Sequence, residues 1–301
     1  MKKFIYMAGA LMLLFPVFSA AQVLPFVAAE YDAASLGTAG ADLADSDNTA
    51  YAAFGNPAAM GFAESKLDAA AGLAMWAPTG GSVITAGASY DLGRLSVAAG
   101  FISGTHQAYD VTSAGGTVTG TFAPTDMLVA AGLSYRLRQA LSLGINVGYA
   151  SSTLSDKHSY GAVKADLFAM VQKEGLSAAL GLRNLGTSVI SASGTKFSLP
   201  SSLALGAAYN MALAEEHRVE VLLDADYYFN EGVAVAAGVE YVMKDLVFVR
   251  GGYRYGGQSP VASYASLGAG AKFAGVKLDV AYLLGSEIMG NTLSVGLGYT
   301  F

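Results

Sequence analysis

The 301-residue sequence contains no cysteine, one tryptophan, three histidines and seven prolines. Without cysteine, the chain has no disulfide bond, no thiolate metal site and no thiol nucleophile. Charged residues make up only 13% of the sequence, against about 25% in soluble domains. The net charge is −6, and the sequence lacks a basic cluster that would neutralise the phosphates of a nucleic acid. We therefore expect no nucleic-acid partner.

Beyond its first residues the sequence also lacks the continuous apolar run of about 20 residues that a membrane-spanning helix needs. A long uncharged stretch, 69–90, is interrupted by Pro78, Gly80 and Gly81. Even so, 53% of the residues are hydrophobic, and the chain has 37 glycines and 17 tyrosines. A closed β-barrel is the other structure that satisfies every backbone hydrogen-bonding group within a bilayer. The composition therefore predicts a transmembrane β-barrel in contact with lipid.

The first 21 residues have the pattern of a secretory signal peptide. Lys2 and Lys3 form a positive start, residues 4–18 are uncharged and apolar, and Ser19 and Ala21 supply the small residues of a cleavage site. We predict cleavage after Ala21 and delivery of the mature chain to the outer membrane of a Gram-negative cell. The alternative, a retained membrane anchor, requires a longer apolar run.

The C-terminal segment shows strict alternation of side-chain type. Leu293, Val295, Leu297 and Tyr299 alternate with Thr292, Ser294, Gly296 and Gly298. This period of two predicts a strand with one face toward lipid and the other toward a barrel lumen. Tyr299 and the terminal Phe301 resemble the C-terminal signal of bacterial outer-membrane proteins, which the barrel-assembly machinery reads during insertion.

Similar alternation upstream predicts an all-β fold, an antiparallel barrel of about 14 strands of roughly ten residues each. The predicted strands are 66–76, 82–90, 94–102, 125–137, 140–150, 160–171, 175–185, 201–211, 217–228, 232–242, 245–255, 262–273, 275–285 and 291–301. Short connectors alternate with longer ones, which is typical of periplasmic turns and outer loops. Residues 66–301 thus form the predicted barrel. Residues 22–65 lack this alternation, and we predict that they form a hatch or plug in the lumen.

The predicted hatch contains a group of small and polar residues, which are Gly37, Gly40, Asp45, Asn56, Pro57 and Ala58. This group resembles the N-terminal signature of the PorV/PorQ family. Further stretches at 181–206, 238–254 and 268–293 match the same family in the same order. More distantly, the Asn-Pro-Ala element resembles the hatch of FadL-type fatty-acid channels. Pro57 favours an extended or turn conformation at Asn56, whose amide can hold backbone groups of the loop.

The resemblance implies a FadL-like barrel in the outer membrane of a Bacteroidetes-type bacterium. It also implies an interaction or anchoring role in type IX protein secretion, with secretion components or secreted substrates as partners. The alternative is a FadL-like channel for small hydrophobic molecules, which would bind an apolar ligand in the lumen. Such a channel needs an apolar pocket, for which Phe168, Met170 and Leu222 are inward-facing candidates, and an opening at a kinked strand.

Many charged residues on the predicted strands fall on the faces that point into the lumen. These inward-facing charges are Arg136, Lys164, Asp166, Arg183, Glu220, Asp224, Asp226, Glu240, Arg250, Arg254, Lys272, Lys277 and Asp279. Either they line a conduction path or bind a ligand, or they form ion pairs that brace the wall and hold the hatch. Because both signs are interspersed, we favour the second interpretation.

The sequence predicts neither a metal site nor an enzyme. Asp42, Asp45, Asp47 and Asn48 do not have the spacing of an EF-hand loop, and no glutamate follows at the required distance. The chain has no nucleophile elbow, P-loop or dinucleotide fingerprint. The one local histidine–carboxylate candidate, Asp156 with His158, is interpreted as a solvated loop pair. We therefore expect no catalytic residues, no metal and no cofactor.

Overall fold

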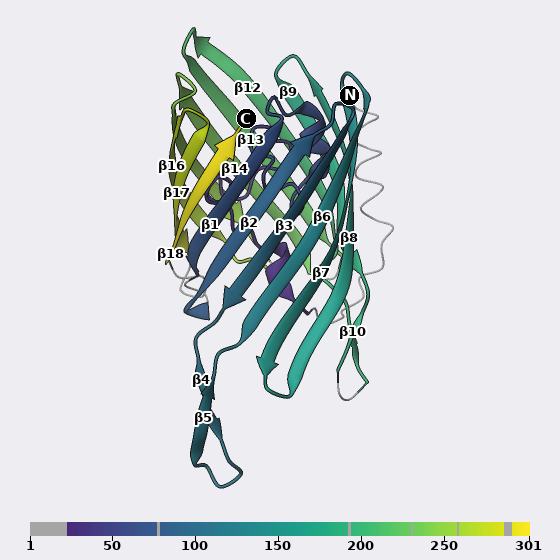
Figure 1. Cartoon of the computed structure of the whole chain (residues 1–301), viewed down its shortest axis with the longest axis vertical. Coiled ribbons are helices and arrows are strands. Elements are labelled where there is room, and N and C mark those ends of the chain that lie inside the picture. The colour runs from purple at the N-terminus through teal and green to yellow at the C-terminus, as the bar shows by residue number, and fades with distance from the viewer. Residues whose placement is uncertain (1–22, 77–78, 192–193, 230, 258, 286–290) are drawn as a thin grey trace.

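The computed structural model describes residues 23–76, 79–191, 194–229, 231–257, 259–285 and 291–301, so the predicted signal peptide lies outside the described residues. Fourteen antiparallel strands close into a barrel (Figure 1), which confirms the predicted fold class. Around the wall the order is β1, β18, β17, β16, β15, β14, β13, β12, β9, β8, β7, β6, β3 and β2.

The wall strands begin and end close to the predicted ranges. They are β1 (Leu67–Trp76), β2 (Gly81–Asp91), β3 (Leu95–Thr105), β6 (Thr125–Arg138), β7 (Leu141–Ser155), β8 (His158–Lys173), β9 (Leu176–Gly186), β12 (Ser202–Ala214), β13 (His217–Tyr228), β14 (Gly232–Met243), β15 (Val247–Tyr255), β16 (Tyr264–Phe273), β17 (Val276–Gly285) and β18 (Asn291–Thr300). The alternation located them because each strand has one lipid-type face and one luminal face.

Two of the predicted loops contain short hairpins. One pairs β4 (Tyr109–Thr112) with β5 (Val118–Phe122) and projects away from the barrel (Figure 1). The other pairs β10 (Val189–Ile190) with β11 (Lys196–Phe197). The residues of β4 and β5 are almost all exposed, so they have no buried face that would produce alternation in the sequence.

The two ends of the barrel differ. At the turn end, uppermost in Figure 1, short connectors such as 92–94 and 274–275 join the strands, and the C-terminus lies there. At the loop end, the longer connectors include the β4–β5 hairpin and residues 187–201. The Phe301 carbonyl accepts hydrogen bonds from the Lys66 and Leu67 amides and so helps to close the barrel at the turn end.

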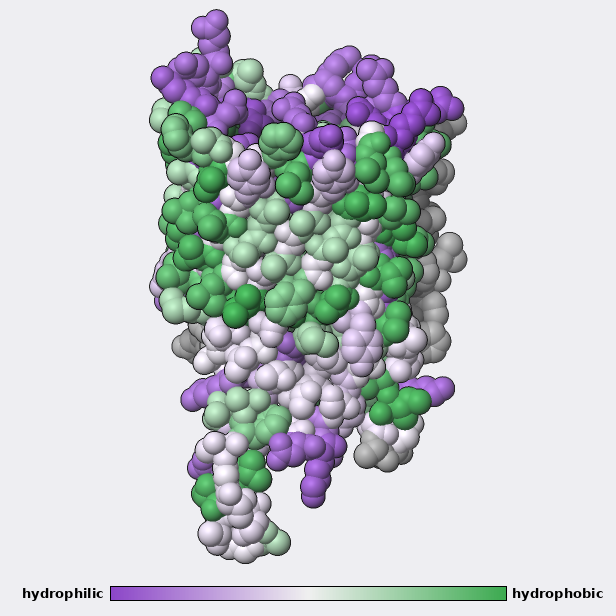
Figure 2. All heavy atoms as spheres, viewed as in Figure 1, coloured by the Kyte–Doolittle hydropathy of each residue, from purple (hydrophilic) through white to green (hydrophobic). Residues whose placement is uncertain are grey.

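The outer wall carries an apolar belt between two polar rims (Figure 2). In β14, for example, exposed and buried residues alternate along the strand. Outward-facing tyrosines lie near the turn end (Tyr90, Tyr135, Tyr209 and Tyr299) and near the loop end (Tyr253, Tyr255 and Tyr282). Aromatic girdles at both edges of an apolar band are typical of barrels embedded in a bilayer. Among the described residues, no helix has the length and apolar character needed to cross a membrane.

Residues 23–66, here called the luminal segment, lie inside the barrel (Figure 1). The segment contains the short helices η1 (Pro25–Ala28), α2 (Ala33–Gly37) and η2 (Pro57–Phe62). Helix α2 packs against β15 to β18, and η2 packs against β6 to β8. Asp32 caps α2 by accepting a hydrogen bond from the Ser35 amide at 3.0 Å.

Candidate functional site

The wall holds the middle of the luminal segment through Asp224 of β13. One carboxylate oxygen of Asp224 accepts hydrogen bonds from the backbone amides of Asp42 and Leu43, each at 2.9 Å. The Asp42 side chain accepts a hydrogen bond from the Ser35 hydroxyl. Burial, followed by the negative charge of Glu30, raises the pKa of the Asp42 carboxyl to about 7. An inward-facing charge thus anchors this part of the segment.

Two further wall residues hold the luminal segment, and the sequence analysis did not select them. The Asn146 amide of β7 is fully buried and donates to the carbonyls of Ala52 and Gly55 at 3.1 and 2.9 Å. Asp68 of β1 accepts from the Thr49 amide at 3.0 Å. The sequence did indicate that Asn146 faces the lumen, because it is an amide residue in the luminal row of an alternating strand. Its partners could not be read from the sequence, because their positions depend on how the luminal segment folds.

Asn56 acts mainly within the luminal segment, and its side-chain nitrogen also contacts the Met170 sulfur of β8 at 3.6 Å. Its side-chain amide donates to the Leu43 carbonyl at 2.7 Å, and its side-chain oxygen accepts from the Ala58 amide at 2.9 Å. Asn56 thereby caps η2, and Pro57 occupies the first position of that helix. Pro57 and Ala58 lie against Gly144 of β7, where an added Cβ would come within 2.5 Å of the Ala58 nitrogen.

The other residues of the PorV/PorQ-like signature lie at separate places in the luminal segment. Gly37 ends α2 and packs so closely on Gly268 of β16 that an added Cβ would lie 3.2 Å from the Gly268 Cα atom. Gly40 has a φ of +72°, a conformation that favours glycine. Asp45 lines a cavity at the turn end. The residues of the signature therefore do not form a single site, because they take part in different turns and contacts.

Arg250 of β15 is the centre of one group of charges inside the lumen. Its guanidinium contacts the carboxylates of Glu240 at 2.5 Å and Asp279 at 2.6 Å, and only 2% of its side chain is exposed. Lys277 contacts Asp279 at 3.7 Å. The Phe248 ring lies 5.2 Å from the Arg250 guanidinium carbon and 5.0 Å from the Lys277 nitrogen. This group ties together β14, β15 and β17.

A second group of charges joins the luminal segment to the wall. Arg183 of β9 contacts Glu30 at 3.3 Å and Asp226 of β13 at 3.8 Å. Arg254 of β15 contacts Asp226 at 3.2 Å. All of these wall charges point into the lumen. They form the kind of ion pairs that the bracing interpretation requires.

The remaining predicted charges also face inward. Arg136 lies over the ring of Phe62, with its guanidinium carbon 5.4 Å from the ring centre. Lys164 and Asp166 of β8 form a buried ion pair at 3.0 Å, with side-chain exposures of 2% and 1%. Each sits on the luminal face of its strand.

The pairing of β8 with β9 is interrupted beside this ion pair. The register shifts between Ala165 and Leu167, so that β9 has an extra residue at this point. Asn184 adopts a φ of +54°, and its backbone amide donates to the Asp166 carboxylate at 2.6 Å. A side chain therefore replaces a strand-to-strand hydrogen bond, which is the arrangement of a β-bulge.

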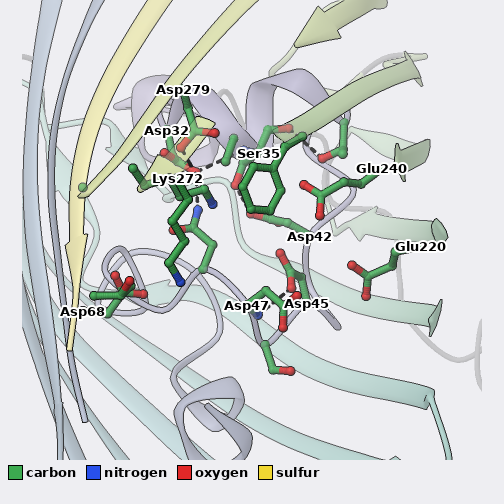
Figure 3. A pocket seen from close by; sticks show the side chains of 18 of the residues that line it. Asp32, Ser35, Asp42, Asp45, Asp47, Asp68, Glu220, Glu240, Lys272 and Asp279 are labelled. Atoms are coloured by element: carbon green, nitrogen blue, oxygen red, sulfur yellow. Dashed lines mark hydrogen bonds and ion pairs between the residues drawn. The ribbon is translucent and has the colours of Figure 1, made fainter. Parts of the chain in front are cut away.

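A cavity of about 730 Å³ lies at the turn end, between the luminal segment and the wall (Figure 3). Its charged lining is mainly acidic and consists of Asp32, Asp42, Asp45, Asp47, Glu64, Asp68, Glu220, Glu240, Asp245 and Asp279, with Arg218, Arg250, Lys272 and Lys277. Burial, followed by the charges of Asp47 and Glu240, raises the pKa of Asp45 to about 8. The excess of carboxylates makes this cavity attractive to cations.

Part of the lumen toward the loop end is apolar, beside the charges of Arg183, Asp226 and Arg254. The buried residues that meet there include Val83, Ile102, Leu128 and Leu283 of the wall and Leu24, Phe26 and Val27 of the luminal segment. We call this cluster the loop-end core. The inner faces of barrels are generally polar. An apolar cluster on the inner wall therefore favours an apolar occupant of this part of the lumen.

Phe168, Met170 and Leu222, the predicted inward apolar residues, do not join the loop-end core. They are buried in a second cluster with the luminal-segment residues Leu43 and Phe62. They pack the luminal segment against β8 and β13, and Leu222 also lines the cavity at the turn end. The sequence placed them on the correct face, but only the fold of the segment determines what covers them.

Glycines in the wall allow the luminal segment to approach closely. A Cβ added at Gly252 of β15 would lie 2.5 Å from the carbonyl carbon of Thr38, whereas at Gly251 the nearest atom would be 3.7 Å away. We expect Gly252→Ala to lower the free energy of unfolding by about 1–3 kcal/mol through overpacking. Gly251→Ala is the matched control, with a change within about 0.5 kcal/mol. Urea unfolding and limited proteolysis of the luminal segment check this, and equal behaviour of the two variants would contradict it.

The fold is that of FadL-like outer-membrane channels. The structure of the P. putida toluene transporter TodX aligns with a TM-score of 0.63 and 14% identity, covering 90% of this chain and 98% of that one. The Ralstonia pickettii toluene transporter TbuX gives 0.62 and 11%, with the same coverage. A Pseudomonas aeruginosa FadL homologue gives 0.55 and 12%, covering 94% of this chain and 100% of that one. The sequence matches no model of a known protein family and no curated protein.

Proposed function

We propose that this protein is an outer-membrane channel for small hydrophobic molecules. The observation that carries the proposal is the loop-end core, in which Val83, Ile102 and Leu128 present apolar side chains to the lumen. A solute without hydrogen-bonding groups is stabilised by such a surface and not by a polar pore. The similarity in fold to the toluene transporters TodX and TbuX supports the same class of solute.

Residues 23–31 of the luminal segment occupy the space that the solute would take. Leu24 and Phe26 are buried in the loop-end core. Polar contacts of this stretch include the bond from the Val23 amide to the Ser198 carbonyl at 3.1 Å, the bond from the Ser294 hydroxyl to the Tyr31 carbonyl at 3.5 Å and the Glu30–Arg183 ion pair. Displacement of this stretch would leave an apolar binding site open to the loop end.

The solute would leave the lumen sideways into the bilayer. The charged residues that line the cavity at the turn end are mainly carboxylates, so this cavity stabilises an apolar molecule poorly. The bulge between β8 and β9 is one of the places where the wall lacks a regular ladder, because the Asp166 carboxylate accepts there a hydrogen bond from the Asn184 backbone amide. We place the exit at this bulge.

Toluene uptake by Gram-negative cells that lack a hydrocarbon channel tests the proposal. We expect cells producing the protein to take up labelled toluene faster than cells without it. Phe26→Ala should increase the rate further, because it removes a side chain from the path. Phe248→Ala, the same truncation among the charges of the turn end, should leave uptake unchanged. An uptake rate that is the same in all four strains would contradict the proposal.

The PorV/PorQ-like signature supports a second function, as an anchoring component of type IX secretion. The projecting β4–β5 hairpin favours it, because Tyr109 and Val118 are 42% and 54% exposed there. The structural neighbours include the toluene transporters TbuX and TodX, and we therefore place this function second. Affinity purification from the native outer membrane distinguishes the two. Secreted proteins that co-purify, combined with no effect on toluene uptake, would favour secretion.

A further inference from the structure

Three carboxylates from two distant parts of the chain meet in the cavity at the turn end. One oxygen from each of Asp45, Asp47 and Glu220 lies within 4.8 Å of the other two (Figure 3). Two oxygens that ligate one Ca²⁺ at 2.3–2.6 Å lie at most about 5 Å apart, so a single ion can contact all three. We infer that these residues form a calcium site that joins the luminal segment to the barrel wall.

The surroundings of the Glu220 side chain indicate that this group of carboxylates binds a ligand. It lies on the luminal face of β13, is only 7% exposed, and is directed toward Asp45 and Asp47 (Figure 3). Among the described residues, none forms a hydrogen bond or an ion pair with its carboxylate. Buried carboxylates are normally paired or bound to a metal. An unpartnered one aimed at two further carboxylates therefore fits a cation ligand.

Nearby basic residues do not neutralise Glu220. Arg218 is engaged with Asp47 at 2.6 Å, and Arg250 is engaged with Glu240 and Asp279. Lys272 lies on the other side of the cavity (Figure 3). When all three carboxylates are ionised, as ligation of a cation requires, they retain two negative charges after Arg218 is counted, which match a divalent cation.

The luminal segment presents its two ligands from a tight turn. The Asp47 amide donates to one oxygen of Asp45 at 2.7 Å, which fixes the two side chains relative to one another. Arg218 contacts one oxygen of Asp47 and leaves the other available to the ion. Three carboxylates beside a cavity of this size leave room for water, which completes the six to eight oxygen ligands of Ca²⁺. The smaller Mg²⁺ requires a stricter octahedral arrangement.

The sequence spacing around Asp45 predicted no metal, because the third carboxylate comes from a strand far along the chain. Bound Ca²⁺ would connect the Asp45–Asp47 turn directly to β13. It should therefore raise the melting temperature and protect residues 32–66 from proteolysis. This consequence does not depend on which solute the barrel carries.

Isothermal titration of the mature protein in detergent, after removal of metals with a chelator, tests the site. We expect Ca²⁺ to bind with a Kd in the range of about 10⁻⁴–10⁻³ M that is typical of extracellular sites, and Mg²⁺ to bind more weakly. Glu220→Gln should weaken Ca²⁺ binding at least about tenfold, because it removes one of the charged ligands. Glu216→Gln is the matched control: it removes a half-exposed carboxylate that pairs with Lys244 near the same rim.

The Arg218→Gln variant is expected to bind Ca²⁺ more tightly, a result that misfolding of the variant cannot produce. It removes a positive charge beside the site, so it should tighten Ca²⁺ binding and enlarge the Ca²⁺-dependent rise in melting temperature. Absence of binding to the folded protein at about 5 mM Ca²⁺, above the extracellular range, would overturn the inference. Equal affinities of the Glu220→Gln and Glu216→Gln variants would also overturn it.

Discussion

Replacement of Arg250 by methionine is expected to lower the free energy of unfolding by about 3–5 kcal/mol. Only 2% of the Arg250 side chain is exposed, and it contacts both Glu240 and Asp279. Methionine fills much of the same space but leaves two carboxylates inside the lumen without their main partner. The large effect thus comes from uncompensated charge, because removal of one partner of a buried pair costs more than the pair contributes.

The measurement is urea unfolding of the protein in phospholipid vesicles, followed by circular dichroism. Addition of Glu240→Gln and Asp279→Asn to the Arg250 variant should restore most of the loss, since it removes both carboxylate charges. Lys173→Gln is the control, because the Lys173–Glu174 pair is 76% and 83% exposed and contributes less than about 1 kcal/mol. If the Arg250 variant is as stable as this control, Arg250 does not brace the wall.

Deletion of residues 23–29 is expected to raise toluene uptake at least about tenfold. The deleted stretch includes Leu24, Phe26 and Val27, each buried in the loop-end core. Burial of one such side chain stabilises the closed arrangement by about 1.5–3 kcal/mol. A change of about 1.4 kcal/mol alters the population of the open state tenfold. The deletion leaves the signal sequence, residue 22 and residues 30–66 in place.

A disulfide lock tests whether the rest of the luminal segment stays in position. The Ala33 Cβ lies 3.5 Å from the place that a Cβ at Gly296 of β18 would take, which is within the range for disulfides. The natural chain has no cysteine, so Ala33→Cys with Gly296→Cys supplies the only thiols. Because only residues 23–31 are proposed to move, the oxidised double variant should transport toluene as fast as its reduced form. Inhibition on oxidation, reversed by reductant, would show that the whole segment moves.

The alternation of side chains determined the barrel. Each strand must present one row to lipid and one to the lumen, so the pattern within ten residues is sufficient to locate it. The same local rule placed Arg250, Asp224 and Lys164 on the inner face. It could not reveal the β4–β5 hairpin, because an exposed hairpin has no buried face and so leaves no period in the sequence.

Only the tertiary structure decided what fills the lumen. The luminal segment has no regular period, and its path is set by contacts with remote strands, such as Asp224 with the Asp42 amide and Asn146 with the Ala52 carbonyl. These contacts separate the apolar loop-end core from the acidic cavity at the turn end and bring Glu220 to Asp45. The spacing of residues in the sequence predicts only which side chains are neighbours within one strand or turn. When a barrel closes around an irregular segment, residues far apart in the sequence come into contact, and their spacing does not predict these contacts.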